Sequence, residues 1–255
     1  MGAMKLLILG GTSEASALAR ALAGDPHYDA MLSLAGRTEY PAPSLIPVRR
    51  GGFGGSEGLA RFLAESRIDV LIDATHPFAA AMKQHAGAAA KQAGAPLLAI
   101  RRPAWEPREG DQWISVANLG KAAAALGDEP KRVLLTTGRN NLAPFAAAPQ
   151  HFYVLRSVAA PALEELPPHV EVITARGPFT LADELRLLGD KSIDILVTKN
   201  SGGTATAAKL DAARALSLPV VMVRRPELPD APANVESVKE ALAWLERGHG
   251  VTSSA

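Results

Sequence analysis

An α/β fold with two parallel-sheet domains is predicted by three features of the sequence. Short runs of Val, Ile and Leu recur along the chain, and Ala-rich stretches with helical spacing separate most of them. This alternation is typical of βαβ units, and purely apolar strands are typical of sheets that helices cover on both faces. The third feature is an internal repeat. Residues 68–103 and 193–226 both begin with Ile-Asp and three apolar residues, pass through a polar loop and an Ala-rich helix, and end in Arg-Arg-Pro.

The first half of the chain predicts five strands and three helices. Its apolar runs are expected to form strands, and the longer Ala-rich stretches between them helices. The expected strands are residues 5–9, 30–34, 47–49, 70–73 and 96–100, and the expected helices are residues 13–23, 57–66 and 78–93. Residues 101–111 are rich in Pro and charge and lack periodicity, which predicts a linker or a crossover.

The second half repeats this pattern. Strands are expected at residues 113–116, 133–136, 152–155, 171–174, 193–197 and 219–223, with helices between most of them. Residues 5–14 (KLLILGGTSE) also resemble residues 132–141 (RVLLTTGRNN), each being a strand followed by a glycine turn and a helix start. A true duplication and the general likeness of any two βαβ units both explain the repeat, and both predict two Rossmann-like units.

The domain organisation follows from the linker and the repeat. Residues 4–103 are expected to form a cofactor-binding domain, residues 104–248 a substrate-binding domain, and residues 249–255 a disordered tail. Polar loops at the carboxyl ends of the strands predict a ligand cleft between the two domains.

Composition excludes several classes of function. The 27 basic and 26 acidic residues nearly cancel, so no overall field draws the chain to nucleic acid or to an anionic membrane. The absence of cysteine rules out disulfides, thiolate nucleophiles and Cys-ligated metals. No apolar run reaches the ~18–20 residues of a membrane helix, and no signal-peptide pattern is present, so a cytoplasmic protein is expected. The serine-hydrolase G-x-S-x-G and metalloprotease H-E-x-x-H motifs do not occur.

The segment from Leu6 to Ala19 is the most informative local motif. Gly10 and Gly11 directly follow a strand, so the chain turns tightly and backbone N–H groups can approach a phosphate. Thr12 and Ser13 are candidates to cap the next helix or to bind a phosphate oxygen, and Glu14 suits its first turn. The segment is not a full G-x-G-x-x-G, so a plain strand-to-helix turn is the other interpretation.

The end of the second strand indicates which dinucleotide binds. An NAD site usually has an acidic residue here, which holds the ribose 2′-hydroxyl. This chain instead has Gly36 and Arg37. An arginine pairs with a 2′-phosphate, which favours NADP over NAD, although a solvated surface arginine is also common at a strand end.

Residues 73–78 (DATHPF) leave the fourth strand where Rossmann-type sheets hold the nicotinamide side of a cofactor. Pro77 fits the first turn of a helix, and Thr75 is a candidate cap. His76 is a candidate hydrogen-bond or proton donor, although a histidine at a helix start is more often structural.

Two loops of the second half have the chemistry of an anion receptor. Residues 136–141 (TTGRNN) and 198–204 (TKNSGGT) each follow an expected strand, and each combines a cation, amides or hydroxyls, glycine and a helix start. Their positions at corresponding strand ends favour a binding site over two unrelated polar loops.

Four motifs together resemble the precorrin-6A reductase family: LILGGTSEA, IDVLIDATHPFA, LLTTGRNNL and the VTKNSGG segment. They occur in the family's order from Lys5 to about Pro226. The resemblance implies two Rossmann-like domains, NADPH as hydride donor, and reduction of one C=C bond of the precorrin-6A macrocycle to give precorrin-6B. It implies no metal. A similar branch of the family acts on the cobalt-containing substrate.

The resemblance also implies roles for particular residues. The cofactor would be bound by Gly10, Gly11, Thr12, Ser13, Glu14, Gly36, Arg37, Asp73, Ala74 and Thr75. The substrate, a tetrapyrrole-derived polycarboxylate, would be bound by Arg139, Lys199, Asn200, Ser201 and Gly202. The proton that accompanies the hydride is left open among water, His76 and Lys199, and Lys199 is also expected to stabilise the electron-accepting system.

Three alternatives remain at this point. One is cobalt-precorrin-6A reductase activity, another is an NADP-dependent reductase with a smaller substrate, and the third is a redox sensor that binds NADP(H) without turnover. The sequence leaves the oligomeric state open.

Overall fold

The computed structural model describes residues 2–36, 43–227 and 231–248 and divides the chain into two compact units. Met1–Pro103 and Pro226–Ala255 make up the first unit, and Ala104–Arg225 make up the second. Each unit contains one six-stranded sheet in which every pairing is parallel. The predicted α/β class with two Rossmann-like parallel sheets is therefore confirmed.

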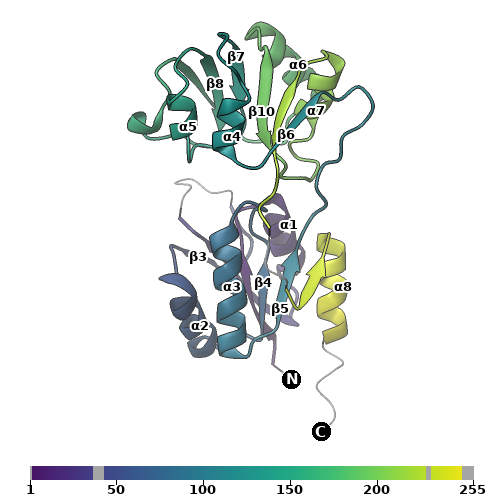
Figure 1. Cartoon of the computed structure of the whole chain (residues 1–255). Helices are drawn as coiled ribbons and strands as arrows, with labels where there is room; N and C mark the ends of the chain where they lie inside the picture. The colour runs from purple at the N-terminus through teal and green to yellow at the C-terminus, as the bar shows by residue number, and fades with distance from the viewer. Residues whose placement is uncertain (1, 37–42, 228–230, 249–255) are drawn as a thin grey trace. The chain divides into compact units, whose positions relative to one another are not determined.

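The first sheet has the strand order β12-β5-β4-β1-β2-β3 (Figure 1). Its elements are β1 (Met4–Leu9), α1 (Ser13–Leu22), β2 (Tyr28–Leu34), β3 (Val48–Arg50), α2 (Gly55–Glu65), β4 (Val70–Asp73), α3 (Ala80–Ala93), β5 (Leu97–Ile100), β12 (Ala233–Val235) and α8 (Val238–Gly248).

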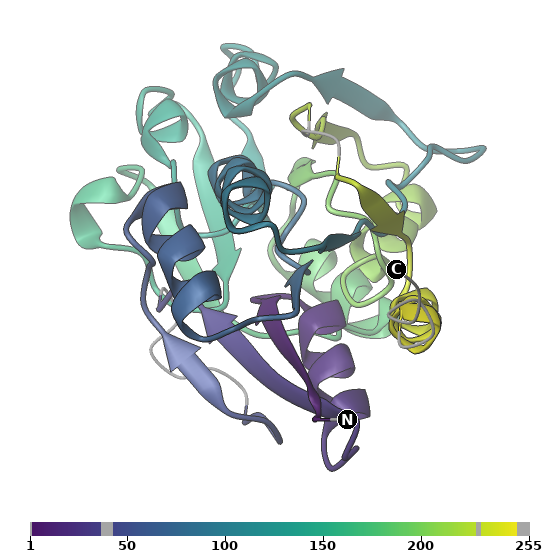
Figure 2. The ribbon, with the colours of Figure 1, turned by 90° about the horizontal axis from the view of Figure 1, so that it is seen from below.

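Successive side chains of the central strand, β1, point to opposite faces of the sheet, and helices pack on both faces to give three layers. Leu6 and Ile8 pack in one cluster with α1 and α8, whereas Leu7 and Leu9 pack in another with α2 and α3. Figure 2 shows the yellow α8 and the purple α1 on one side of the sheet and the blue α2 and α3 on the other. Each fully buried aliphatic side chain stabilises the folded state by about 1.5–3 kcal/mol. The apolar strand β1 therefore stabilises the packing of helices on both faces of the sheet.

The second sheet has the order β6-β11-β10-β7-β8-β9. Its unit contains β6 (Trp113–Val116), α4 (Leu119–Ala124), β7 (Arg132–Leu135), α5 (Ala143–Ala146), β8 (Phe152–Ser157), a 3₁₀ turn (Leu163–Glu165), β9 (Val170–Thr174), α6 (Leu181–Asp190), β10 (Ile195–Lys199), α7 (Ala208–Ala215) and β11 (Val220–Val223). Val154 packs with α6 and α7, while its neighbour Tyr153 packs against Phe145 of α5, so helices cover both faces.

The internal repeat has a matching structure. Asp69 accepts a hydrogen bond from the backbone N–H of Lys5 at 2.7 Å, and Asp194 accepts one from Arg132 at the same distance. Both contacts tie the start of the central strand to the segment before the neighbouring strand. The two halves of the chain therefore repeat contacts as well as hydrophobic pattern.

The edge strands correct the predicted domain boundary. β6 follows β5 in sequence but pairs with β11 of the second sheet, and β12 follows β11 but pairs with β5 of the first. Residues 104–248 are therefore not one domain, because the segment from Pro226 onward belongs to the first unit. The strand β12 was not predicted, since Ala-Asn-Val lacks an apolar run and its pairing partner lies far away in sequence. The predicted tail, 249–255, lies outside the described residues.

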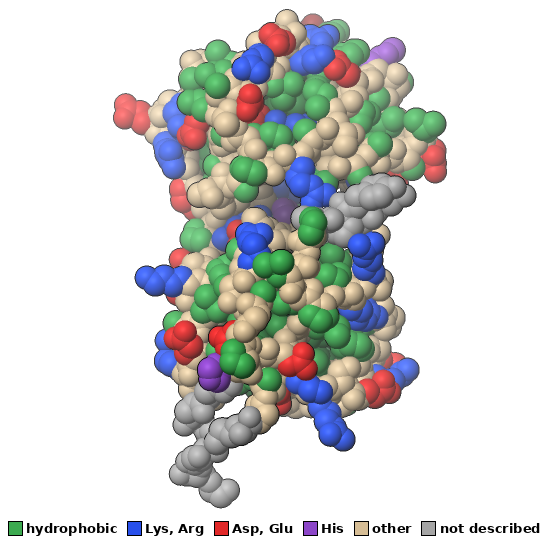
Figure 3. All heavy atoms as spheres, turned by 180° about the vertical axis from the view of Figure 1, so that it is seen from behind, with side chains coloured by type: hydrophobic (Ala, Val, Ile, Leu, Met, Phe, Trp, Pro, Cys, Tyr) green, Lys and Arg blue, Asp and Glu red, His purple; other side chains and the backbone are tan. Residues whose placement is uncertain are grey.

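The surface carries charges of both signs. On the face drawn in Figure 3, basic and acidic side chains are interspersed over both units. None of the helices in the described part of the chain combines the length and the apolar character that a membrane crossing requires.

His151, which precedes β8, is a buried imidazole. Burial lowers its pKa below the ordinary 6.5, and the positive charge of Lys131 adds to this. The unfolded chain therefore binds more protons than the folded chain as pH falls below 6.5, and the folded state loses stability there by up to about 1.4 kcal/mol per pH unit.

His151→Phe is expected to remove this acid-dependent loss, because phenylalanine cannot be protonated. Urea unfolding at several pH values between 5 and 8 measures the effect. The exposed His169 provides the matched control, and His169→Phe should retain the pH dependence of the unsubstituted chain. Parallel pH profiles for His151→Phe and the unsubstituted chain would contradict the assignment.

Candidate functional site

The turn between β1 and α1 is built as the sequence predicts. A Cβ on Gly10 would lie 2.5 Å from the Leu32 side chain, and Gly11 has a φ of 110°, so both positions favour glycine. Thr12 is the N-cap of α1, and its hydroxyl oxygen accepts from the N–H of Ala15 at 3.2 Å. The first N–H groups of α1 and the positive end of its dipole therefore lie directly after the turn, where an anion binds favourably.

Thr12 also joins this turn to the loop after β4. Its hydroxyl donates to the carbonyl oxygen of Ala74 at 2.7 Å, and Ala74 N–H donates to the carbonyl of Leu9 at 3.0 Å. The predicted cofactor residues of the two loops thus lie side by side at the carboxyl edge of the sheet. This is the edge at which parallel α/β sheets bind ligands.

Asp73 has partners within its own unit. Its carboxylate is buried, accepts from the backbone N–H and hydroxyl of Thr75 at 3.0 and 2.6 Å, and pairs with Lys83 Nζ at 3.0 Å. Both carboxylate oxygens are thus bonded within the protein, and the cofactor role of Asp73 stays a prediction. The side chain fixes the loop that contains Ala74 and Thr75.

The start of α3 differs from the prediction. The helix begins at Ala80 and its N-cap is Ala79, so Thr75 lies before the cap position and no side chain caps the helix. The Thr75 hydroxyl donates to Asp73. His76 is half-buried, and its Nδ1 accepts from the N–H of Phe78 at 3.2 Å. The imidazole is thus oriented by its own turn, with Nδ1 unprotonated in this arrangement.

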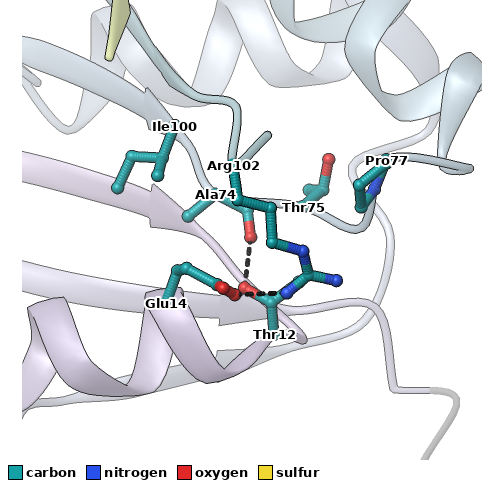
Figure 4. Close-up of a pocket in the computed structure, with 7 residues that line it drawn as sticks. All are labelled: Thr12, Glu14, Ala74, Thr75, Pro77, Ile100 and Arg102. Carbon is teal, nitrogen blue, oxygen red and sulfur yellow. Dashed lines mark hydrogen bonds and ion pairs between the residues drawn. The ribbon is translucent and has the colours of Figure 1, made fainter. Parts of the chain in front are cut away.

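A small pocket lies between these two loops and the end of β5 (Figure 4). It has a volume of about 10 Å³, and its lining consists of Thr12, Glu14, Ala74, Thr75, Pro77, Ile100 and Arg102. Arg102 Nη1 pairs with Glu14 Oε2 at 2.7 Å. Burial alone would raise the pKa of Glu14, but the hydrogen bond and charge of Arg102 outweigh it and lower the pKa. Glu14 is therefore held as a carboxylate at neutral pH.

The end of β2 leads to the predicted specificity residues. Gly36 has a φ of 76°, and Gly51 N–H donates to the carbonyl of Leu34 at 2.9 Å, which joins the ends of β2 and β3. Arg37 lies outside the described residues. Its assignment to a 2′-phosphate stays a prediction from the sequence.

In the second unit, Lys199 and Thr137 meet at the ends of β10 and β7. Lys199 Nζ donates to the carbonyl oxygen of Thr137 at 2.8 Å, and burial lowers the pKa of this lysine. The hydroxyl of Thr137 is buried and has no hydrogen-bond partner among the described residues. The side chain of Arg139 donates to the carbonyl of Ala160 at 3.3 Å. The two predicted cations thus lie at the ends of neighbouring strands, Arg139 after β7 and Lys199 as the last residue of β10.

Both polar groups of the Asn200 side chain form hydrogen bonds with the backbone of Trp105. Its amide oxygen accepts from the backbone N–H of Trp105 at 2.8 Å, and its amide nitrogen donates to the carbonyl of Trp105 at 2.9 Å. The Trp105 indole donates to the carbonyl of Gly203 at 2.8 Å. The Asn200 side chain thus connects the linker to this loop, and its substrate role stays a prediction.

The loop after β10 is held further by Arg225, which the sequence analysis did not assign. Its guanidinium donates to the carbonyls of Asn200 and Ser201 at 2.9 and 3.1 Å. Gly202 has a φ of 65° and is buried, so it contributes backbone rather than surface to the loop. Ser201 and Gly202 keep their predicted substrate roles as proposals.

Lys83, Arg102 and Arg225 were missed for two reasons. Lys83 looks like an ordinary helix lysine, and only the fold brings it to Asp73. Arg102 and Arg225 occupy the same position of the two Arg-Arg-Pro repeats, a signal that was visible in the sequence but carried no chemical meaning by itself.

Comparisons with known proteins agree with this arrangement. The profile of the family described as "Precorrin-6x reductase CbiJ/CobK" matches residues 5–246. Precorrin-6A reductase of Rhodococcus erythropolis is 48% identical over 241 residues, which cover 94% of this chain and 97% of the relative. A solved structure named CobK precorrin-6A reductase superposes with a TM-score of 0.91 at 44% identity and covers 96% of both chains. Cobalt-precorrin-6A reductase of Priestia megaterium is 28% identical over 239 residues, which cover 88% of this chain and 91% of the relative.

Proposed function

Because the chain belongs to the precorrin-6x reductase family, we propose that it reduces precorrin-6A to precorrin-6B with NADPH in cobalamin biosynthesis. The observation that carries this proposal is the family match, which extends over both structural units. The chain is accordingly an oxidoreductase that acts on a CH–CH group. The higher identity to the cobalt-free relative than to the cobalt-precorrin relative favours the cobalt-free substrate.

The turn after β1 fits the pyrophosphate of a dinucleotide. A Cβ added at Gly11 would meet no atom within 4 Å, so the space above this turn is open where the N-terminus of α1 begins. Gly11 and Thr12 would present backbone N–H groups to the phosphates, and Ser13 would add a hydroxyl. The N–H of Gly10 donates to the carbonyl of Ser33 at 2.9 Å, so Gly10 would contribute by letting the phosphates approach the backbone closely. Glu14 would reach the ribose, while Ala74 and Thr75 would line the nicotinamide side.

Bound NADPH would supply a hydride from C4 of its nicotinamide to one carbon of a C=C bond of the macrocycle. The neighbouring carbon takes a proton, so that the double bond becomes CH–CH. The protein's contribution is to position the reacting atoms and to place charge. His76 at the end of β4 and Lys199 at the end of β10 are the two side chains proposed to hold or donate that proton, with water as the third source.

The second unit would bind the carboxylates of the macrocycle. Arg139 and Lys199 provide cations at neighbouring strand ends, and Ser201 and Gly202 extend the same edge. Trp105 and Asn200 would keep the loop of Ser201 in place. The ligand cleft expected between the two units stays a prediction.

Arg37→Ala is expected to raise the Kd for NADPH roughly 10–100-fold and to leave the Kd for NADH nearly unchanged. The reason is that a charge-assisted pair with the 2′-phosphate, worth about 1.5–3 kcal/mol, exists only for NADPH. Titration of each cofactor by fluorescence measures both constants. Arg20→Ala, which removes an exposed arginine at the far end of α1, is the matched control and should change neither constant. Equal weakening of both cofactors would contradict the specificity argument.

The activity itself is tested by an anaerobic assay of NADPH absorbance with purified precorrin-6A. NADH, the cobalt-containing substrate and a reaction without substrate are run in parallel. We expect oxidation that requires both NADPH and precorrin-6A. NADPH binding without oxidation of either substrate would favour a redox sensor, and oxidation with the cobalt-containing substrate alone would place the chain in the other branch.

A further inference from the structure

Arg102 reaches from the end of β5 to the first turn of α1. It lies two residues beyond β5, and in the sheet β4 stands between β5 and β1. Its Nη1 nevertheless contacts Glu14 Oε2 at 2.7 Å, so the side chain crosses the end of β4 (Figure 4). The two side chains are 14% and 20% exposed, so the pair is largely but not completely covered.

The equivalent arginine of the second unit has a different contact. Arg225 donates to two backbone carbonyls of the loop after the neighbouring strand, and this contact braces the loop. Arg102 is instead anchored on a carboxylate at the N-terminus of a helix, beside the glycine turn. The same repeat position therefore serves as a loop brace in one unit and as a placed cation in the other.

The position of this cation suits one part of a dinucleotide. The helix N-terminus already attracts anions, and a guanidinium beside it strengthens that attraction. Glu14 offsets part of the charge but holds the arginine in place. Across a doubly wound sheet the adenosine lies on the β2 side of the glycine turn and the nicotinamide on the β4 side. Arg102 approaches from β5, which is the nicotinamide side.

We infer that Arg102 is a cofactor-binding residue that supplies positive charge to the nicotinamide-side phosphate of the pyrophosphate, with Glu14 as its positioning residue. The inference rests on the proposed function, because it requires that a dinucleotide binds at the β1–α1 turn. It differs from the role proposed for Arg37, which concerns the 2′-phosphate on the adenosine side.

Three ligands distinguish the contact proposed for Arg102 from the contact proposed for Arg37. NADP⁺ and 2′-phospho-ADP-ribose contain both phosphates of the pyrophosphate. Adenosine 2′,5′-bisphosphate ends at the adenosine-side phosphate and lacks the nicotinamide-side phosphate. Calorimetric titration of the full-length chain with each ligand gives the three dissociation constants, and thermal unfolding reports whether a variant is folded at the temperature of the titration.

Arg102→Gln is expected to raise the Kd for NADP⁺ and for 2′-phospho-ADP-ribose at least ~10-fold, as expected for the loss of a charge-assisted contact. The Kd for adenosine 2′,5′-bisphosphate should change less than about twofold. Arg102→Lys keeps the charge, and it should lose less affinity for NADP⁺ than Arg102→Gln does. If Arg102→Gln does not fold, Arg102→Lys still has to weaken the two longer ligands selectively.

Two results would overturn the inference. One is an unchanged Kd for NADP⁺ in a folded Arg102→Gln variant, and the other is an equal loss of affinity for all three ligands, which a general structural role predicts. Failure of the premise that a dinucleotide binds at the β1–α1 turn gives a separate result, because the unsubstituted chain would then bind none of the three ligands.

Discussion

Replacing Lys199 with methionine is expected to lower kcat/KM for precorrin-6A by about 100–1,000-fold while NADPH still binds. The ammonium group lies at the end of β10 and donates to the carbonyl of Thr137. A charge placed in a partly desolvated site is worth more than in water, and removal of one such electrostatic contact typically costs this factor. Lys199 belongs to the second unit, whereas the proposed cofactor residues belong to the first. Loss of turnover and loss of NADPH binding should therefore separate.

The pH dependence of kcat/KM is a second test of the role of Lys199. Burial lowers its pKa, so the charged form is lost at a lower pH than for an ordinary lysine. If the ammonium is required, kcat/KM falls as pH rises through this lowered pKa, and Lys199→Arg should shift the fall to higher pH. Lys191→Met is the control, because Lys191 forms only a half-exposed pair with Glu171, and such pairs contribute little. Unchanged kcat/KM in Lys199→Met, or an equal loss of NADPH binding, would contradict the assignment.

Lys83→Met is expected to destabilise the first unit by about 3–5 kcal/mol. The Lys83 and Asp73 side chains are 2% and 3% exposed, and loss of the lysine leaves a buried carboxylate without its counter-charge. Because Asp73 also holds Thr75, the loop at the nicotinamide side should loosen, and NADPH affinity should fall with stability. Urea unfolding of the single variant measures the loss.

The double variant Asp73→Asn/Lys83→Met tests whether the unpaired buried charge causes the loss of stability. Removal of both charges should recover at least half of the lost stability, since asparagine can still accept from Thr75 through its amide oxygen. Lys91→Met removes an exposed lysine of the same helix and should change stability by less than about 0.5 kcal/mol. A double variant that is no more stable than Lys83→Met would show that the buried charge is not the cause.

The sequence predicted the parts of the fold that depend on local pattern. Apolar runs such as residues 6–9 and 70–73 are strands whose side chains are all buried, and the turn at Gly10 and Gly11 follows from glycine chemistry. The exchange of β6 and β12 was not predictable in this way. A short edge strand can pair with either sheet, and only long-range packing decides which sheet it joins.

In the candidate site, too, the features set by local sequence were predictable and those set by long-range contacts were not. The capping hydroxyl of Thr12 was predictable, since a threonine between a glycine turn and a helix has one favoured role. Asp73 and Asn200 were assigned as ligand contacts because of their loops, but their partners lie 10 residues away in Lys83 and 95 residues away in Trp105. Loop composition identifies polar residues at a strand end. It does not show which of them are already bonded to the protein.

Transfer of deuterium from labelled NADPH to the product is the most direct test of the central claim. The chain is incubated anaerobically with precorrin-6A and NADPH that carries deuterium on one or the other face of nicotinamide C4, and the product is analysed by mass spectrometry. We predict that one of the two labelled cofactors gives a product heavier by one deuterium and one hydrogen, and that the other gives a product heavier by two hydrogens. Oxidation of NADPH without deuterium in the product from either labelled cofactor, or no oxidation at all, would contradict hydride transfer to the macrocycle.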